Sequence, residues 1–342
     1  MHLSLVVPAP FDAVSGGYAY DRRIVAGLRA AGHTIDVIEL AGTHPLADEA
    51  AHSAARVALQ GEARPIIDGL ALAAFAGLDD ALAARDAVAL IHHPTALETG
   101  LSEADRAPLF RLEKRLLALL SRIVVTSLAT AERLAADFAV DRERIKVVVP
   151  GTDDAPRSAG SGGPTCHILS IGTLVPRKGH DLLLRALARL FDLDWRLTIV
   201  GSADRDPVHA HALAALAEAL GIARRVRFAG EVTGEALEAL WQQADLFALA
   251  THWEGYGMAI AEALKHGVPV AVSAGGAAGN LVTPESGVVT PVGDHTNLSK
   301  ALRRLMFGAG LRREMAEAAW QVGQTLPDWP TQVREFAQAL TV

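Results

Sequence analysis

Short apolar runs rich in β-branched residues alternate with longer stretches rich in alanine and leucine along the whole chain. The runs are apolar throughout rather than alternating, which is typical of strands in a parallel sheet that helices cover on both faces. Strands are therefore predicted at 3–7, 34–40, 88–92, 122–126, 145–149, 167–172, 196–200, 226–229, 246–250, 268–272 and 287–289, and helices at 18–31, 107–120, 128–138 and 330–340. This alternation predicts an α/β fold.

The segment from Gly151 to Thr165 interrupts the pattern, because it is rich in glycine, serine and proline and has little to bury. Such a composition is typical of a linker. Two doubly wound, Rossmann-like domains are therefore predicted, at 1–152 and 165–325, with a C-terminal helix at 326–342 that can pack back on the first domain. Sheets of this type bind ligands at the carboxyl ends of their strands, so we expect a cleft between the two domains.

Composition narrows the possible function classes. Hydrophobic residues make up 50% of the 342 positions, and the formal net charge of −7 disfavours a nucleic-acid-binding protein. The single cysteine, Cys166, excludes an intrachain disulfide and a cysteine-rich zinc site. The first residues do not resemble a signal peptide, and no apolar run is long enough to span a bilayer, so we expect a cytoplasmic protein.

The segment 252–264 carries the strongest functional signal in the chain. Gly255 and Gly257 permit a tight turn, and the apolar run after them predicts a helix whose first amides and positive dipole end favour a phosphate. Glu254 precedes the turn and Glu262 lies about one and a half turns into the helix, so both carboxylates flank the anion site. This arrangement suits a sugar nucleotide, with amides for phosphate and carboxylates for hydroxyls. The alternative is a surface helix with an acidic first turn.

Three further loops follow predicted strands. Gly16 and Gly17 lie where doubly wound folds bind phosphate, although an ordinary strand-to-helix turn also explains them. Arg177 and Lys178 follow the first strand of the second domain, and two adjacent cations either suit a diphosphate or form a solvated surface pair. The glycine-rich stretch 274–280 either lets the backbone approach a ligand closely or forms a flexible loop.

Two other features leave alternatives open. His92 and His93 end a predicted strand, where a histidine can donate a hydrogen bond or bind a hydroxyl. Adjacent strand residues point to opposite sides, so at most one of the two faces a ligand, and both can be ordinary loop residues. The basic amphipathic stretch 111–122 can contact a membrane surface peripherally, but packing of its leucines on its own sheet is favoured.

Four motifs together resemble the retaining glycosyltransferases of family 4, which have the GT-B fold of two Rossmann-like domains facing across a cleft. In chain order they are Gly16-Gly17, Pro176-Arg177-Lys178-Gly179, Val226-Arg227-Phe228-Ala229-Gly230 and the element from Glu254 to Glu262. The resemblance covers nearly the whole chain and is strongest between about 165 and 310, where the order and spacing of the motifs match.

The resemblance implies a role for each matching residue. The implied catalytic residues are His92, Arg177, Lys178 and Glu254, and the implied donor-binding residues are Gly16, Gly17, Arg227, Gly257, Met258, Ala259 and Glu262. Arg177 and Lys178 would neutralise the diphosphate leaving group, which amides near Met258 would also bind. Glu254 would hold hydroxyls of the sugar and Glu262 those of the ribose.

Two positions depart from the family pattern. Many members carry an arginine where Thr173 stands and a glutamate where Gly279 stands, so Arg177 is expected to take more of the charge and the sugar contacts near Gly279 are open. Arg227 belongs to the segment that would contact the base. His92 matches the family's histidine through its spacing to a proline, with His93 as the alternative.

The implied reaction moves a hexose from a nucleotide-diphosphate sugar, UDP-hexose first and GDP-mannose second, to an acceptor hydroxyl with retention of configuration. The acceptor is open: lipid-linked, a saccharide or a small metabolite. No Asp-x-Asp metal motif is expected in the sequence, so the reaction is expected to need no metal, and no cofactor is expected. A nucleotide-sugar epimerase on the same fold and a non-catalytic sugar-nucleotide-binding protein are the alternatives.

Overall fold

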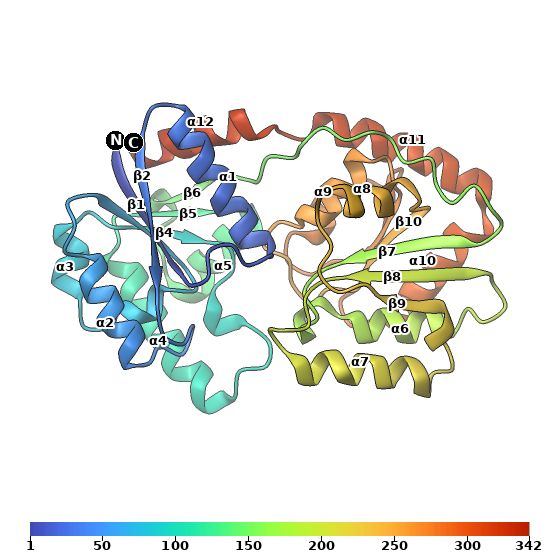
Figure 1. Cartoon of the computed structure of the whole chain (residues 1–342), viewed down its shortest axis with the longest axis horizontal. Coiled ribbons are helices and arrows are strands. Elements are labelled where there is room, and N and C mark those ends of the chain that lie inside the picture. The colour runs from blue at the N-terminus through green and yellow to red at the C-terminus, as the bar shows by residue number, and fades with distance from the viewer. Residues whose placement is uncertain (342) are drawn as a thin grey trace. The chain divides into compact units, whose positions relative to one another are not determined.

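A computed structural model describes residues 1–341 of the chain (Figure 1). The chain divides into two compact units. One comprises Met1–Gly151 together with the C-terminal segment from Asp328 onward, and the other comprises Thr152–Pro327. Each unit is built on its own parallel sheet, so the α/β prediction is confirmed.

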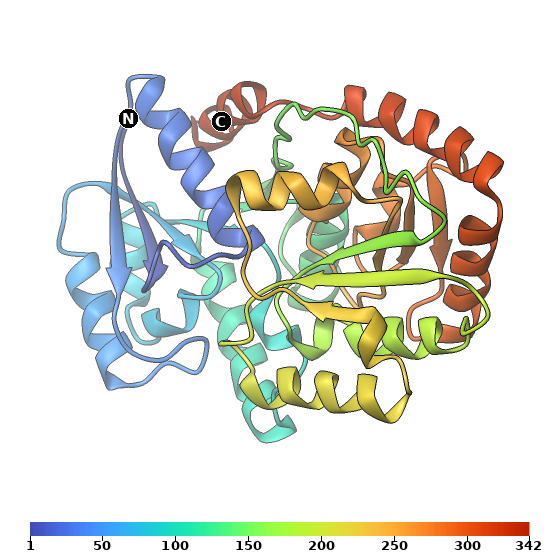
Figure 2. The same ribbon diagram turned by 45° about the vertical axis from the view of Figure 1, so that its right-hand side comes forward.

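The first unit contains a six-stranded parallel sheet in the order β2-β1-β3-β4-β5-β6. Its strands are β1 (His2–Pro8), β2 (Thr34–Leu40), β3 (Arg64–Asp68), β4 (Val88–Ile91), β5 (Arg122–Val125) and β6 (Ile145–Val147). Its helices are α1 (Gly16–Ala30), α2 (Glu49–Ala58), α3 (Asp79–Ala84), α4 (Glu103–Leu119), α5 (Leu128–Phe138) and α12 (Trp329–Thr341). Helices α1 and α12 pack together on one face, with α2, α3 and α4 on the other (Figures 1 and 2).

The strand order of this sheet reverses at β1, which pairs with β2 on one edge and with β3 on the other: Leu3 aligns with Ile35 of β2 and with Arg64 of β3. Strand β3 was missed from the sequence, because Pro65 lies within it and a long apolar run follows it. The predicted strands that correspond to β1, β2, β4, β5 and β6 are confirmed with small shifts at their ends.

The second unit contains a six-stranded parallel sheet in the order β12-β11-β10-β7-β8-β9. Its strands are β7 (Cys166–Ile171), β8 (Trp195–Val200), β9 (Val226–Phe228), β10 (Leu246–Leu249), β11 (Val270–Ser273) and β12 (Gly287–Thr290). Its helices are α6 (His180–Ala188), α7 (Pro207–Ala219), α8 (Gly234–Gln242), α9 (Met258–Lys265), α10 (His295–Phe307) and α11 (Ala309–Thr325). All six strands were predicted, and the order reverses between β7 and β10.

The segment predicted as a flexible linker is instead packed on the second unit. The Ser158 amide donates to the His266 carbonyl, and its hydroxyl donates to the Ala244 carbonyl at 3.0 Å. Asp154 accepts a hydrogen bond from Lys265 at 2.9 Å. Small residues let this segment follow the surface closely, so a composition typical of linkers also suits an irregular segment that packs on the surface of a domain.

The C-terminal helix α12 belongs to the first unit. It packs on α1, where Val333 lies so close to Gly27 that a side chain at that glycine would overlap it. Tyr20 of α1 contacts the rings of Trp329 and Phe336 edge-on. Among the residues that the structure describes, no helix is long and apolar enough to cross a membrane.

Candidate functional site

Strands β7 and β10 are neighbours at the point where the order of the second sheet reverses. The loop after β7 forms a 3-10 turn (Pro176–Lys178) that brings Lys178 to the loop after β10. There the Lys178 Nζ donates to both carboxylate oxygens of Glu254, at 2.7 and 3.0 Å. Only 15% and 9% of the two side chains are exposed. Two predicted site residues therefore form a buried ion pair at the switch point, where such sheets bind ligands.

The Glu254 carboxyl group is held in its ionised form. Burial raises the pKa of Glu254, but the charges of Lys178 and Arg177 and the hydrogen bond from Lys178 outweigh burial, so the pKa lies below its usual value. An ionised carboxylate accepts hydrogen bonds and donates none. Glu254 is therefore suited to hold hydroxyl groups rather than to supply a proton.

Arg177 is used largely to hold the loops together. Its Nη1 donates to the Trp253 carbonyl at 2.6 Å and lies 4.0 Å from the Glu254 carboxylate. Its own carbonyl accepts a hydrogen bond from the hydroxyl of Thr251 at 3.1 Å. Thr251 is fully buried and was not predicted as a site residue, because a single threonine after a strand carries no distinctive signal. Of the two predicted cations, Lys178 is thus the closer charge.

The glycine-rich loop after β11 packs against Glu254. The Glu254 amide donates to the Gly275 carbonyl at 3.0 Å, and the Ala277 amide donates to the Glu254 carbonyl at 2.9 Å. Gly276 has a φ of 62°, and a Cβ there would lie 2.3 Å from the Glu254 carbonyl oxygen. The absence of side chains in this loop therefore serves contact between two loops and requires no ligand to explain it.

Helix α9 begins at Met258, directly after Gly257, whose φ of 100° lies in the left-handed region. The predicted turn and helix start are confirmed. The carbonyl of Gly257 accepts the amides of Ile260 and Ala261, so the amides of Met258 and Ala259 come before the hydrogen-bonded part of the helix. Such amides and the helix dipole together favour an anion at this end of α9.

Glu262 lies on α9 in the position expected from the sequence. Its carboxylate has no hydrogen bond or ion pair to any side chain within residues 1–341, and burial raises its pKa to about 7. The side chain is partly exposed, and no side chain of the described residues satisfies its oxygens. Glu262 is therefore ready to accept hydrogen bonds from a bound hydroxyl-bearing ligand.

Arg227 lies on the edge strand β9 with an exposed side chain. Throughout the described part of the chain it has no hydrogen bond or ion pair to the Lys178–Glu254 pair. Its expected contact with a base stays a prediction.

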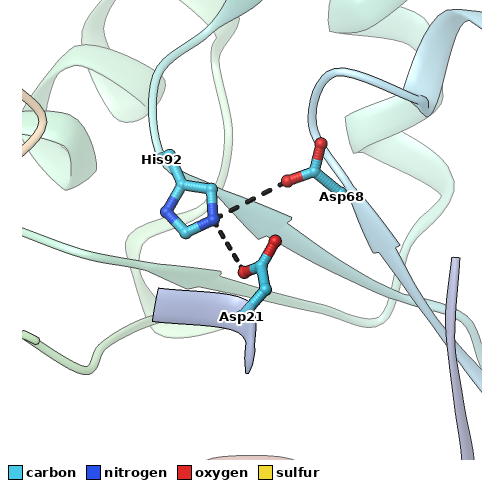
Figure 3. Close-up of side chains that lie close together, drawn as sticks. All are labelled: Asp21, Asp68 and His92. Carbon is cyan, nitrogen blue, oxygen red and sulfur yellow. Dashed lines mark hydrogen bonds and ion pairs between the residues drawn. The ribbon is translucent and has the colours of Figure 1, made fainter. Parts of the chain in front are cut away.

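In the first unit, three side chains meet at the switch point of the sheet (Figure 3). Asp21 comes from the second turn of α1, Asp68 ends β3 and His92 follows β4. The His92 Nε2 lies 2.9 Å from Asp21 Oδ1 and 3.7 Å from Asp68 Oδ2. Gly17 borders the cluster, because a Cβ there would lie 3.2 Å from His92 Cδ2. Gly17 and His92 were predicted as site residues, and the structure brings them together.

Asp21 and Asp68 were missed from the sequence. Asp21 is fully buried on α1, on the same inward-facing side as Tyr20 and Ile24. The helical periodicity of the sequence could therefore have identified it as a buried acidic residue. Asp68 ends the strand that was not predicted. Glu113 of α4 was also missed, although it accepts the amides of Thr95 and Ala96 and so fixes the turn that follows His92.

The expectation that no Asp-x-Asp sequence occurs was wrong. The chain contains this spacing at 192–194 and at 204–206. Asp192 is paired with Arg303 at 2.6 Å, and Asp194 accepts a hydrogen bond from Thr165 at 2.6 Å. The Asp204 carboxylate accepts a hydrogen bond from Ser202. These exposed aspartates are engaged in local structure, so metal independence stays a prediction about the reaction.

Comparison with known families identifies the second unit. Residues 153–322 match the family model described as "Glycosyl transferases group 1". A D-inositol 3-phosphate glycosyltransferase from Salinispora tropica is 32% identical over 251 residues, which are 66% of this chain and 51% of that protein. An MMP alpha-(1->4)-mannosyltransferase from Mycolicibacterium hassiacum is 29% identical over 259 residues, covering 68% and 62%. The matched part of the chain thus spans about half to three fifths of these relatives.

Solved structures share the whole fold at low sequence identity. Sucrose-phosphate synthase from Thermosynechococcus elongatus superposes with a TM-score of 0.82 at 19% identity and covers 98% of both chains. Alr3699/HepE from Anabaena, in complex with UDP-glucose, gives a TM-score of 0.78 at 19% identity, over 99% of this chain and 100% of that one. The chain therefore has the GT-B fold and belongs to the group 1 glycosyltransferases.

Proposed function

We propose that the chain is a retaining hexosyltransferase that takes its sugar from a nucleotide diphosphate, with a UDP-hexose favoured over GDP-mannose. The observation that carries the proposal is the buried Lys178–Glu254 ion pair at the switch point of the second unit. The Anabaena structures in complex with UDP and with UDP-glucose support the uridine donor. The mannosyltransferase from Mycolicibacterium hassiacum supports mannose as the second choice.

The charges at this site suit a diphosphate that leaves during the reaction. Lys178 and Arg177 carry two positive charges against the single charge of Glu254, and the start of α9 adds amides and a positive dipole end. Cations and amides placed in advance stabilise the charge that develops on a leaving group, and removal of one such contact typically costs about 2.7–4 kcal/mol of transition-state stabilisation.

Each carboxylate has a different task in this mechanism. Glu254 is ionised and accepts hydrogen bonds from hydroxyls of the sugar, which places the anomeric carbon beside the cations. Glu262 accepts hydrogen bonds from the ribose hydroxyls. The acceptor hydroxyl attacks the anomeric carbon, the bond to the diphosphate oxygen breaks, and the departing phosphate takes the proton of the acceptor. The acceptor is a lipid-linked sugar, a saccharide or a small metabolite.

Two other functions use the same residues differently. A nucleotide-sugar epimerase would convert the donor with no acceptor present, so isomerised donor after incubation with the protein alone would support it. A sugar-nucleotide-binding protein without activity would bind the donor and release no nucleotide diphosphate with any acceptor.

A thermal-shift screen against UDP-, GDP- and ADP-sugars tests donor binding first. A ligand at a hundredfold excess over its dissociation constant adds about 2.7 kcal/mol of apparent stability. Nucleotide release is then measured with an acceptor panel, and NMR of the anomeric proton identifies the product configuration. Lys178→Ala should lose most activity, whereas Lys300→Ala, at an exposed position on α10, should keep it. An inverted product contradicts retention, and full activity of Lys178→Ala contradicts the site.

A further inference from the structure

His92 has one ring nitrogen committed to the interior of the first unit. Its Nε2 lies 2.9 Å from the Asp21 carboxylate and 3.7 Å from that of Asp68. Asp21 is fully buried and Asp68 is 4% exposed. Figure 3 shows that all three side chains point toward one another.

The charges of this cluster balance best when His92 is protonated. A neutral His92 would leave two buried carboxylates side by side with one N–H between them, which is a costly arrangement of like charges. The Asp21 Oδ2 is also buried and has no hydrogen-bond partner within the described residues. The Asp68 Oδ1 accepts the Leu70 amide at 2.8 Å. An imidazolium ion places a positive charge 2.9 Å from the unsatisfied Asp21 carboxylate and 3.7 Å from that of Asp68.

The tyrosine ring that packs on His92 does not supply that charge. Tyr20 packs edge-on against the His92 ring, with the two ring centroids 5.3 Å apart. It stays neutral because burial and the nearby carboxylates of Asp21 and Glu335 hold its pKa well above the usual value. The pKa of His92 is raised: burial lowers it, but the attraction of Asp21, the hydrogen bond to Asp21 and the attraction of Asp68 together outweigh burial.

The second nitrogen of His92 faces the other way. Nδ1 points away from both carboxylates in Figure 3, and it has no hydrogen-bond partner within residues 1–341. The side chain is 22% exposed, so this nitrogen is the part of the cluster that can meet a ligand. His92 follows β4, beside the point where the strand order of the first sheet reverses.

We propose that Asp21 and Asp68 are positioning residues that keep His92 protonated, so that its Nδ1–H meets a substrate oxygen as a cationic hydrogen-bond donor. This inference rests on the proposed glycosyl transfer. It makes His92 a hydrogen-bond donor and not a general base: the residue donates to an oxygen of the sugar or of the phosphate, and it does not take the proton of the acceptor hydroxyl. A general base would need Nδ1 to be unprotonated.

The same three side chains are close enough to surround a cation, since their nearest donor atoms lie within 4.8 Å of one another. The hydrogen bond of 2.9 Å between His92 and Asp21 already fills this role, because the imidazolium ion is itself the cation. The two states exclude each other at Nε2, which cannot hold a proton and a metal ion together.

NMR of the histidine ring nitrogens in the full chain tests the proposal without any substrate. The His92 signals are assigned by their loss in His92→Gln. We expect both ring nitrogens to be protonated at pH 7, and Asp21→Asn to lower the proton affinity of His92 at least tenfold, which is one pKa unit. Asp68→Asn should have a smaller effect in the same direction. Asp36→Asn is the matched control, because this aspartate of the same unit is exposed and is not part of the cluster, so the variant should leave the His92 signals unchanged.

Kinetics then connect the charge to the reaction. Because the imidazolium form is lost as the pH rises through the raised pKa of His92, activity should fall on the alkaline side, and Asp21→Asn should move that fall to lower pH. A neutral His92 at pH 7 in the wild-type chain, or one divalent metal ion per chain that Asp68→Asn releases, overturns the proposal. If no sugar nucleotide binds but His92 titrates as described, the glycosyl-transfer function fails and the charged cluster stands.

Discussion

Replacement of Lys178 by methionine gives the most quantitative test of the site. Methionine keeps the length and apolar stem of the side chain but removes its charge. Glu254, 9% exposed, then keeps only the more distant Arg177 at 4.0 Å. Loss of one partner from a buried ion pair costs about 3–5 kcal/mol, and we expect the lower end because the Glu254 carboxyl can take up a proton instead.

The size of the effect should depend on pH. In the wild-type chain the folded-state pKa of Glu254 lies below its ordinary value of 4.5, so this group stabilises the fold above that pH and loses its contribution only as the pH falls through the lowered pKa. In Lys178→Met the attraction of Arg177 and the hydrogen bond from Thr251 remain, but without Lys178 they offset burial less, so the pKa of Glu254 should rise. The deficit should therefore be about 3 kcal/mol at pH 7 and should shrink as the pH falls toward 4.5.

Hydrogen exchange measured on peptides from β7 and β10 reports the stability of the second unit, and peptides from β1 and β4 serve as an internal reference. In a unit of this size a loss of about 3 kcal/mol lowers the melting temperature by about 6–12 °C. The double variant Lys178→Met with Glu254→Gln should recover most of the loss, and Lys300→Met should have no effect. A coupling energy within the ~0–1 kcal/mol of exposed pairs would refute the buried ion pair.

Three other variants test separate parts of the structure. Glu262→Gln should weaken donor binding. Because the folded-state pKa of Glu262 is raised, the wild-type chain should lose stability, on the order of 2–3 kcal/mol, as the pH rises from 4.5 to about 7, and Glu262→Gln should remove this loss. Equal pH profiles of unfolding for Glu262→Gln and the exposed control Glu285→Gln would contradict this. Gly17→Ala places a methyl group 3.2 Å from the His92 ring and should lower activity with little change in melting temperature, whereas an unchanged turnover number would show that the ring has room to move. Thr251→Val removes the hydroxyl that bonds to the Arg177 carbonyl and should cost about 1–3 kcal/mol in denaturant unfolding, a reading that a neutral effect would disprove.

Local patterns of residues were sufficient to predict most of the strands and the position of the candidate site in the second unit. Apolar runs are local features, so β7 to β12 were readable without a structure. The helix start after Gly257 was readable as well, because a glycine turn followed by an apolar helical run is a pattern of neighbouring residues. Strand β3 was not readable, since Pro65 and the apolar run after it hide its limits.

Which side chains meet depends on how the distant segments pack in the fold. Lys178 and Glu254 are 76 positions apart, and they form an ion pair because parallel pairing of β7 with β10 brings the two following loops to one edge of the sheet. Asp21 and His92 are 71 positions apart, and they meet because α1 and β4 flank the switch point of the first sheet. The type of each residue, which the sequence gives directly, determines the chemistry that its side chain can perform. The charge state of Glu254, Glu262 and His92 depends instead on burial and on partners that the fold supplies from distant segments.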